Sequence, residues 1–439
     1  MDKKLLYYIW LSSSLYAGSV TPKILLEYYK DIEKIYNATP EDYLKLGIRK
    51  KDAQKLADKS LEKAEKYYNF CVKERVGILC YDNPYYPQRL KCISDPPPMF
   101  YYRGRVEMLD DHPCFAMVGT RSCSENGFRN AYRIGYKAAV RGAVAVNGIA
   151  QGIDAAILTG ALDAGGYAVA LLGSGIDRIY PASNKELFSR LARQGLILSE
   201  FSPYSRPDGK NFPVRNRVIS GLSLGCLVLE ADMGSGAMHT ASHAYSQGRR
   251  MYAVPGDITS KLYEGPLSLI KGGATPVTDA DDFIFEYALM FPHRISMNTD
   301  ATVNPVTEKD AVDMAFSIYE ITKDKSSSKK RTLPEPKKFS SQKAKKDSKN
   351  SLSEINKKVS EDGENNNAKA VPPSDLPDLT VLSVSERAIY SLFEQSEILT
   401  VDEIASKGIK VDDVLSSLTM LEIYGFVTLL PGGRYQKSN

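Results

Sequence analysis

The nine residues from Gly209 to Arg217 combine the side-chain types that bind nucleic acid. Their sequence, Gly-Lys-Asn-Phe-Pro-Val-Arg-Asn-Arg, holds three cations, two amides and one aromatic ring. Cationic side chains neutralise phosphates, and an aromatic ring stacks on a base of any identity. We predict that this segment binds a nucleic acid; the alternative is a surface loop that is only rich in arginine. The residues predicted to take part are Lys210, Asn211, Phe212, Arg215, Asn216 and Arg217.

Glycine-rich turns follow several strand-like apolar runs between Ala116 and Val277. Each turn stands where a strand would pass into a helix, so its backbone N–H groups can face an anion. The carboxyl ends of parallel strands meet at one edge of a sheet, and ligands bind along that edge. We therefore expect a phosphate-bearing ligand there. The turns contain Gly119, Gly148, Gly152, Gly173, Ser174, Gly175, Gly234, Ser235 and Gly236.

Three charged side chains follow such turns directly. Arg121 comes after a Gly-Thr pair, from which a guanidinium can bind an oxyanion through two hydrogen bonds. The alternative for Arg121 is an ion pair with a local acid such as Glu125. Asp154 and Asp177 also lie just beyond glycine turns, where helix capping explains them as well as ligand contact does.

The elements that position these residues follow an alternating strand–helix pattern, and the strands are continuously apolar. This pattern predicts an α/β fold with an extended Rossmann-like, doubly wound and mostly parallel sheet, covered on both faces. The expected strands are Cys114–Val118, Ala143–Val146, Tyr167–Leu172, Leu196–Phe201, Cys226–Ala231 and Met251–Val254. The expected helices are Phe128–Arg141, Ile153–Ala164, Lys185–Arg193 and Ala237–Ser246.

Composition divides the chain into five parts. We expect a helical domain at 1–70, a connector rich in proline and tyrosine at 71–110, and the Rossmann-like core at 111–290. Residues 291–377 are expected to be a largely disordered linker, and 378–439 a winged-helix domain. Residues 44–48 resemble a helix-hairpin-helix turn, which can hold a DNA phosphate; a small helical packing domain (SAM-like) is the alternative.

The two C-terminal parts differ in charge. The whole chain has 57 Lys and Arg against 53 Asp and Glu, a net charge of +4. Residues 323–350 alone hold eleven Lys or Arg and three Asp or Glu, so the remainder is mildly acidic. The expected recognition helix of the winged-helix domain carries Asp412, Asp413 and Glu422 and no basic residue. Because DNA-reading helices present basic or amide side chains to bases, we interpret this domain as a protein-contact or regulatory module.

Several function classes are excluded by missing motifs. The chain has neither a G-x-G-x-x-G opening nor a Walker A sequence, so no dinucleotide or P-loop nucleotide cofactor is expected. His239 and His243 have the spacing of a zinc helix but lack its glutamate, so no metal is expected. Six cysteines without C-x-x-C spacing indicate a reducing, cytoplasmic location. No apolar run reaches about 20 residues, so we expect no membrane insertion.

Several motifs together, in one order over about residues 80–285, resemble the bacterial DNA-processing protein A family (DprA/Smf). Helical N-terminal and winged C-terminal domains also occur in that family. The motifs are Val118-Gly119-Thr120-Arg121, Gly152-Ile153-Asp154, Leu172-Gly173-Ser174-Gly175-Ile176-Asp177-Arg178-Ile179-Tyr180-Pro181, Asn211-Phe212-Pro213-Val214-Arg215-Asn216-Arg217 and Ala253-Val254-Pro255-Gly256.

The resemblance implies a non-enzymatic protein that binds single-stranded DNA, protects incoming DNA during natural transformation and loads the RecA recombinase. It also implies a homodimer. Carried over by motif, the DNA pocket would contain Arg121, Gly173, Ser174, Lys210, Phe212, Arg215 and Arg217, with Gly119, Gly175, Asn211 and Asn216 beside them. Ser235, Gly236 and Thr240 match a further small-residue turn of the family.

The chain departs from the family pattern at five positions. Asn147, Gln151, Leu158, Ala237 and Leu267 stand where the family has Ser, Arg, His, Ser and Asn. The loss of an arginine at 151 removes one potential phosphate contact.

Two other functions stay open. One is a Rossmann-like enzyme that cleaves N-glycosidic bonds, although residues 234–241 lack the glutamate of the P-G-G-x-G-T-x-x-E turn in such hydrolases. The other is a nucleotide-sensing regulator that acts through the winged helix.

Overall fold

The computed structural model describes residues 2–297 and 311–320, and residues 384–437 with short gaps. Its largest feature is a nine-stranded sheet with the spatial order β1-β2-β6-β5-β4-β3-β7-β8-β9. Neighbouring strands from β6 to β9 are parallel, whereas β1 and β2 are antiparallel. The strands are β1 Gly77–Cys80, β2 Met99–Gly104, β3 Cys114–Val118, β4 Val144–Asn147, β5 Ala168–Leu171, β6 Leu196–Ser199, β7 Gly225–Val228, β8 Arg250–Ala253 and β9 Thr275–Pro276.

Both faces of the sheet are buried because the strands are apolar at consecutive positions. In β3, Phe115 and Met117 join a core on one face, while Cys114, Ala116 and Val118 join a core on the other. Alternate side chains of a strand point to opposite faces, so an unbroken apolar run requires cover on both sides.

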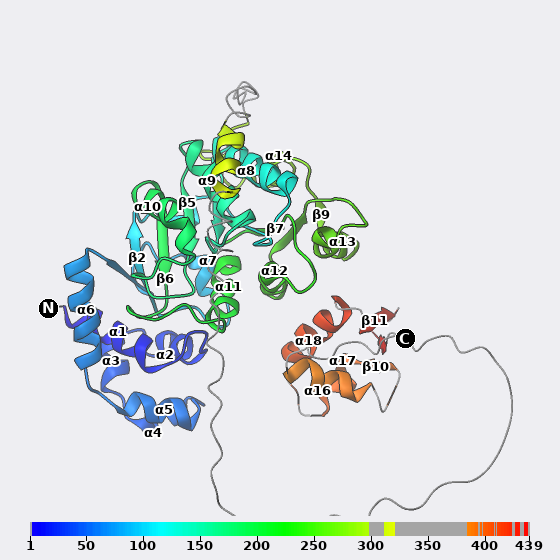
Figure 1. Cartoon of the computed structure of the whole chain (residues 1–439). Coiled ribbons are helices and arrows are strands. Elements are labelled where there is room, and N and C mark those ends of the chain that lie inside the picture. The colour runs from blue at the N-terminus through cyan, green and yellow to red at the C-terminus, as the bar shows by residue number, and fades with distance from the viewer. Residues whose placement is uncertain are drawn as a thin grey trace, which may run out of the picture.

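Helices supply this cover (Figure 1). The core on one face includes residues of α8, α9, α10 and α14, and the core on the other includes residues of α7, α11 and α12. The helices are α7 Gln88–Lys91, α8 Glu125–Val140, α9 Ile153–Asp163, α10 Lys185–Gln194, α11 Asn211–Gly221, α12 Gly236–Ser246, α13 Glu264–Lys271 and α14 Asp281–Ile284.

The order of the strands creates a switch point between β3 and β7. From β3 the chain winds through β4 and β5 to β6, and it then returns to β7 on the other side of β3. The connections that leave the carboxyl ends of β3 and β7 therefore run in opposite directions, which opens a crevice at that edge.

The predicted α/β class and mostly parallel sheet are confirmed. Every strand and helix predicted between 114 and 254 begins and ends within three residues of the observed one. Helix α11, which contains most of the segment 209–217, was not expected from the sequence.

The interpretation of residues 71–110 as a connector needs correction. This stretch contains β1 and β2, which extend the main sheet through the pairing of β2 with β6. The three consecutive prolines at 96–98 exclude regular structure only between the two strands.

Helices also fill the first part of the chain. They are α1 Lys3–Ser14, α2 Thr21–Tyr29, α3 Ile32–Asn37, α4 Pro40–Lys45, α5 Lys50–Ala57 and α6 Glu62–Glu74. Their buried side chains, among them Ile9, Leu25 and Leu56, belong to the same apolar cluster as one face of the sheet. A left-handed Gly47 (φ 76°) lies in the turn between α4 and α5.

Most of the expected linker at 291–377 lies outside the described residues. Within it, residues 311–320 form a helix, which the sequence analysis did not foresee. This helix packs on α8, where the rings of Phe128 and Tyr319 stack with centroids 4.8 Å apart. Arg129 of α8 also forms an ion pair with Asp313.

The described C-terminal residues form three helices and a small antiparallel sheet with the order β10-β12-β11. These elements share an apolar core of their own that includes Ile389, Leu418 and Phe426. The winged-helix assignment stays a prediction. The elements are α16 Val384–Leu392, β10 Ile398–Thr400, α17 Val401–Ala405, α18 Val411–Ile423, β11 Val427–Leu430 and β12 Arg434–Lys437.

Candidate nucleic-acid-binding site

A cleft of about 670 Å³ opens at the switch point, beyond the carboxyl ends of β3 and β7. The loop after β3, the N-terminal half of α11 and the turn before α12 form its walls. Eight of the fourteen predicted site residues line this cleft: Gly119, Arg121, Phe212, Arg215, Asn216, Ser235, Gly236 and Thr240. The tertiary structure therefore brings together segments that are more than 100 residues apart in the sequence.

Phe212 stands at the centre of the cleft residues. The guanidinium carbon of Arg121 lies 5.4 Å from the centre of its ring, and that of Arg215 lies 5.9 Å away. The Tyr180 ring approaches with a centroid distance of 5.6 Å. A Cβ atom on Gly173 would lie 2.7 Å from the Phe212 ring, so a larger residue there would displace the ring. We call Phe212, Arg121, Arg215 and Tyr180 the Phe212 stack.

Arg121 presents its charge to solvent. The side chain is exposed, and it forms no ion pair with any residue that the structure describes. The alternative pairing with Glu125 is wrong, because Glu125 bonds Arg129 at 2.8 Å. The loop that carries Arg121 is fixed beside it, since the Thr120 N–H donates to the Glu230 carbonyl at 2.6 Å. Arg121 is therefore an available cation on a fixed loop.

Arg215 is a buried cation that supports the cleft from below. Its side chain is 5% exposed, and its guanidinium donates to the Gly148 carbonyl at 3.2 Å and to the Leu171 carbonyl. Its Nε donates to Oδ1 of Asn216 at 3.1 Å. Burial lowers the pKa of Arg215 to about 10, partly opposed by the negative charge of Asp154. The guanidinium therefore stays protonated at neutral pH.

Asp154 and Asp177 organise loops. Asp154 accepts hydrogen bonds from the N–H groups of Gly148 at 3.0 Å and Ala150 at 3.3 Å, which shapes the loop after β4. Burial raises the pKa of Asp154, and nearby Arg215 opposes the rise. Asp177 accepts from the Tyr204 N–H at 2.8 Å. Neither aspartate serves as the side-chain N-cap of a helix; Gly152 holds the N-cap position of α9.

The beginning of α12 forms the opposite wall. Ser235 caps this eleven-residue helix by accepting from the Ala237 N–H at 3.3 Å. Asn216 of α11 donates to the Gly236 carbonyl at 3.1 Å, which ties the two helices together across the cleft. The partial positive charge of a helix N-terminus therefore faces the same space as Arg121.

Comparisons with known proteins identify chains that are similar to this one. The family model described as DNA recombination-mediator protein A matches residues 77–288. Protein Smf of Synechocystis sp. is 33% identical over 286 residues, which cover 63% of this chain and 71% of that protein. The chain belongs to the DNA recombination-mediator protein A family. DNA processing protein DprA of Streptococcus pneumoniae is 38% identical over 202 residues, covering 46% of this chain and 71% of that protein. The X-ray structure of DprA from Streptococcus pneumoniae aligns with a TM-score of 0.56 and 30% identity, covering 65% of this chain and 98% of that chain.

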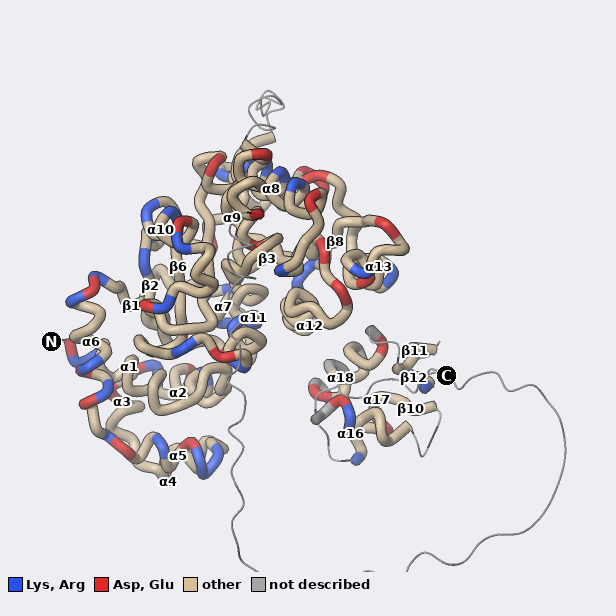
Figure 2. Tube along the Cα trace, viewed as in Figure 1, with Lys and Arg blue, Asp and Glu red and all other residues tan. Residues whose placement is uncertain are grey.

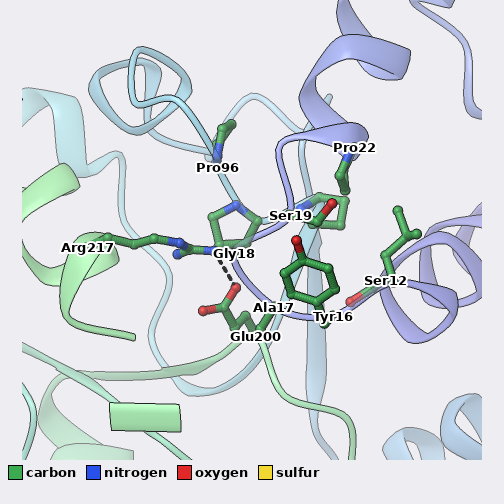
Figure 3. Close-up of a pocket in the computed structure, with 12 residues that line it drawn as sticks. Ser12, Tyr16, Ala17, Gly18, Ser19, Pro22, Pro96, Glu200 and Arg217 are labelled. Carbon is green, nitrogen blue, oxygen red and sulfur yellow. Dashed lines mark hydrogen bonds and ion pairs between the residues drawn. The ribbon is translucent and has the colours of Figure 1, made fainter. Parts of the chain in front are cut away.

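One residue predicted from the family motif lies away from the cleft. Arg217 is 3% exposed and donates to Glu200 at 2.8 Å, while its Nε lies 2.8 Å from an oxygen of Asp95. Figure 3 shows the pair of Arg217 and Glu200 beside Gly18 and Pro96. Two residues along a helix correspond to a rotation of about 200°, so Arg217 and Arg215 point to opposite sides. Arg217 therefore ties α11 to the segment after β6 and to the loop between β1 and β2.

Five other predicted residues lie near the cleft without lining it. Ser174 is buried and donates to the Arg178 carbonyl at 3.2 Å, and the Gly175 N–H donates to the Ser205 carbonyl at 2.9 Å. Asn211 donates to the Gly173 carbonyl at 3.1 Å. These three residues and Gly173 shape the floor below Phe212, whereas Lys210 is exposed at the start of α11.

Three of the residues that depart from the family pattern bond or pack within the protein. Gln151 donates to the Ser183 hydroxyl at 2.8 Å, so its amide is used within the protein. Leu158 is fully buried in α9 and belongs to the core. Asn147 donates to the Asp154 carbonyl at 3.0 Å and accepts from the Ile149 N–H. The substitutions at 147 and 158 therefore affect packing more than ligand contact.

Tyr180 and His239 line the cleft but were not among the predicted residues. Tyr180 lies 32 positions before Phe212, and only the fold brings the two rings together. Among the described residues, no group of three or more His, Cys, Asp or Glu side chains could hold a metal ion. Across the same residues, none of the helices has the length and apolar character that crossing a membrane requires.

Proposed function

We propose that this member of the DNA recombination-mediator protein A family binds single-stranded DNA in the cleft at the switch point. The Phe212 stack carries the proposal. The Phe212 ring offers a stacking surface to a base, and the exposed Arg121 beside it offers a charge to a phosphate next to that base, while the buried Arg215 supports the ring from below. Binding of this kind tolerates any sequence, because every base has a π face.

Preference for single strands follows from the position of the ring. A base in a duplex is stacked on its neighbours and cannot also stack on Phe212. The described residues that line the cleft include Arg121 and Arg215 but no lysine. Because its bases cannot stack on Phe212, duplex DNA would gain only the contacts between its phosphates and Arg121.

A role in recombination is the second part of the proposal. The matching family is described as a recombination-mediator, which favours a protein that passes single-stranded DNA to the RecA recombinase, as a homodimer and without catalysing a reaction itself. Addition of the protein to single-stranded DNA covered by a single-strand-binding protein should accelerate RecA filament assembly. Unchanged assembly would contradict this role.

The flanking parts have proposed roles as well. The helices before residue 75 stabilise the core on which they pack. The basic stretch at 323–350 tethers the C-terminal elements and adds a weak, salt-sensitive attraction to DNA. The C-terminal winged-helix module contacts a protein partner, since the sequence of its presumed recognition helix is acidic.

The deciding experiment compares oligonucleotides. Fluorescence anisotropy with single-stranded and double-stranded DNA of equal length, at about 50 mM and about 200 mM salt, measures both preference and salt dependence. We expect single strands to bind more tightly at both salt concentrations, with little dependence on sequence. Equal affinity for both forms would contradict the proposal.

A further inference from the structure

Tyr204 is an exposed aromatic residue in an unusual backbone conformation. It lies on the loop between β6 and α11, its side chain is among the exposed large hydrophobic ones at 44%, and its φ is +70°. Left-handed backbone is uncommon for a bulky residue and is retained where the surrounding structure enforces it. Here the Tyr204 N–H donates to Asp177 at 2.8 Å, which holds the backbone in place.

The N-terminal helices supply the surroundings of this ring. The ammonium group of Lys66 on α6 lies 5.6 Å from the centre of the Tyr204 ring. The ring of Phe70, one turn further along α6, contacts Tyr204 edge-on with a centroid distance of 5.2 Å. Figure 2 marks both basic and acidic residues along the trace of α6. Tyr204 therefore combines an exposed ring with a cation from a different part of the chain.

The loop from Tyr204 leads directly into the cleft. Pro207 and Gly209 line the cleft, and Phe212 follows at the start of α11. Between the two aromatic residues lie Arg206 and Lys210, both exposed and without an ion pair to any described residue. The nearest acid, Asp208, accepts from the Lys210 backbone N–H at 3.0 Å.

Aromatic residues separated by free cations are the arrangement that binds a single strand, because bases stack on the rings while phosphates meet the charges. We propose that Tyr204, with Lys66 of α6, forms a second base-stacking subsite for the strand bound at Phe212. The inference rests on the proposed function of the cleft and extends it: the N-terminal helices complete the DNA-binding surface. One strand would run from Phe212 past Lys210 and Arg206 to Tyr204.

The test uses three substitutions of Tyr204 in the full chain. Tyr204→Phe keeps a ring, whereas Tyr204→Ala and Tyr204→Gly both remove it. Glycine adopts the left-handed backbone without strain, so the glycine variant should be more stable to urea than the alanine variant. If the ring binds DNA, both ring-free variants should bind an oligothymidylate of about 20 nucleotides about tenfold more weakly than wild type, and equally weakly, while Tyr204→Phe binds normally.

Oligonucleotide length separates the two subsites. An oligothymidylate of about four nucleotides fills only the region of Phe212, so its affinity should not change in the Tyr204 variants, whereas Phe212→Ala should weaken both lengths. Lys66→Met should lower the salt dependence of binding to the longer oligonucleotide by the amount that corresponds to about one phosphate contact. Tyr28 and Lys34, which are exposed elsewhere on the N-terminal helices, supply the matched controls. The variants Tyr28→Ala and Lys34→Met should bind both oligonucleotides like wild type.

The outcomes distinguish this inference from the proposed function. Wild-type protein that binds neither oligonucleotide would overturn both. Wild-type binding with normal affinity of the ring-free variants for the longer oligonucleotide would overturn the second subsite alone. Affinity that followed urea stability, with alanine weaker than glycine, would show a structural role for Tyr204 and would also overturn it.

Discussion

Arg215 and Arg217 have the same side chain and stand two positions apart, but the fold gives them different surroundings. Arg215 lies under Phe212 and bonds backbone carbonyls, while Arg217 pairs with Glu200 and Asp95 on the far side of α11. The residue types predicted a group of residues of which eight out of fourteen lie together in one cleft. That this cleft binds nucleic acid stays a prediction. Which arginine faces the cleft depends on helical phase, which could be assigned only once α11 was known.

Substitutions in the Phe212 stack can separate the electrostatic contribution to DNA binding from the stacking contribution. Arg121→Ala should weaken binding of single-stranded DNA and flatten its salt dependence by about one charge, because Arg121 is an exposed cation. Phe212→Ala should weaken binding by about 1–3 kcal/mol and leave the salt dependence unchanged, because a ring neutralises no phosphate. Titrations at several salt concentrations measure both effects. A lower salt dependence in Phe212→Ala would contradict this division of roles.

At the scale of the elements, the apolar strands could be predicted from the sequence, whereas helix α11 and the strands β1 and β2 could not. Parallel strands such as β3 and β5 are apolar without interruption, so composition alone identifies them. Helix α11 was missed because Asn211, Pro213, Arg215 and Asn216 hide its apolar period. Its first buried residues are the polar Arg215, Asn216 and Arg217, and its buried apolar residues begin only at Val218. The strands β1 and β2 were missed because prolines and tyrosines dominate the composition around them.

The contact between α11 and the loop that joins α1 to α2 can be tested by substitution of two glycines. Gly18 (φ +82°) and Gly47 (φ +76°) both have left-handed backbone, but a Cβ on Gly18 would lie 3.1 Å from Val214 of α11, whereas nothing surrounds one on Gly47. Either substitution by alanine should lower the free energy of unfolding by about 1–2 kcal/mol through backbone strain. Gly18→Ala should cost about 1 kcal/mol more, because Val214 must shift. Equal losses in urea denaturation would contradict docking at this contact.

At the scale of the whole molecule, the core carries the site and the other parts are additional to it. We can therefore predict what a truncated chain loses. Every residue that lines the cleft lies between Val118 and Thr240. A chain that ends at residue 320 keeps the helix 311–320 and its stacking of Tyr319 on Phe128, whereas a chain that ends at 297 loses them. The shorter chain should therefore be less stable by about 1–3 kcal/mol, because it loses the buried Tyr319 ring and its contact with Phe128. Urea denaturation of the two chains measures the difference, and equal stability would show that this helix contributes nothing to the core.

The same truncation at residue 320 separates specific from nonspecific DNA binding. It removes the basic stretch at 323–350 and the C-terminal elements but leaves the Phe212 stack intact. Affinity for single-stranded DNA at about 200 mM salt should therefore persist, because it depends on the cleft. Affinity at about 50 mM salt should fall relative to the full chain, because eleven cations against three acids no longer attract phosphates over a long range. Loss of binding at both salt concentrations, by a chain whose circular dichroism shows a folded core, would place the DNA-binding site in the tail instead of at the switch point.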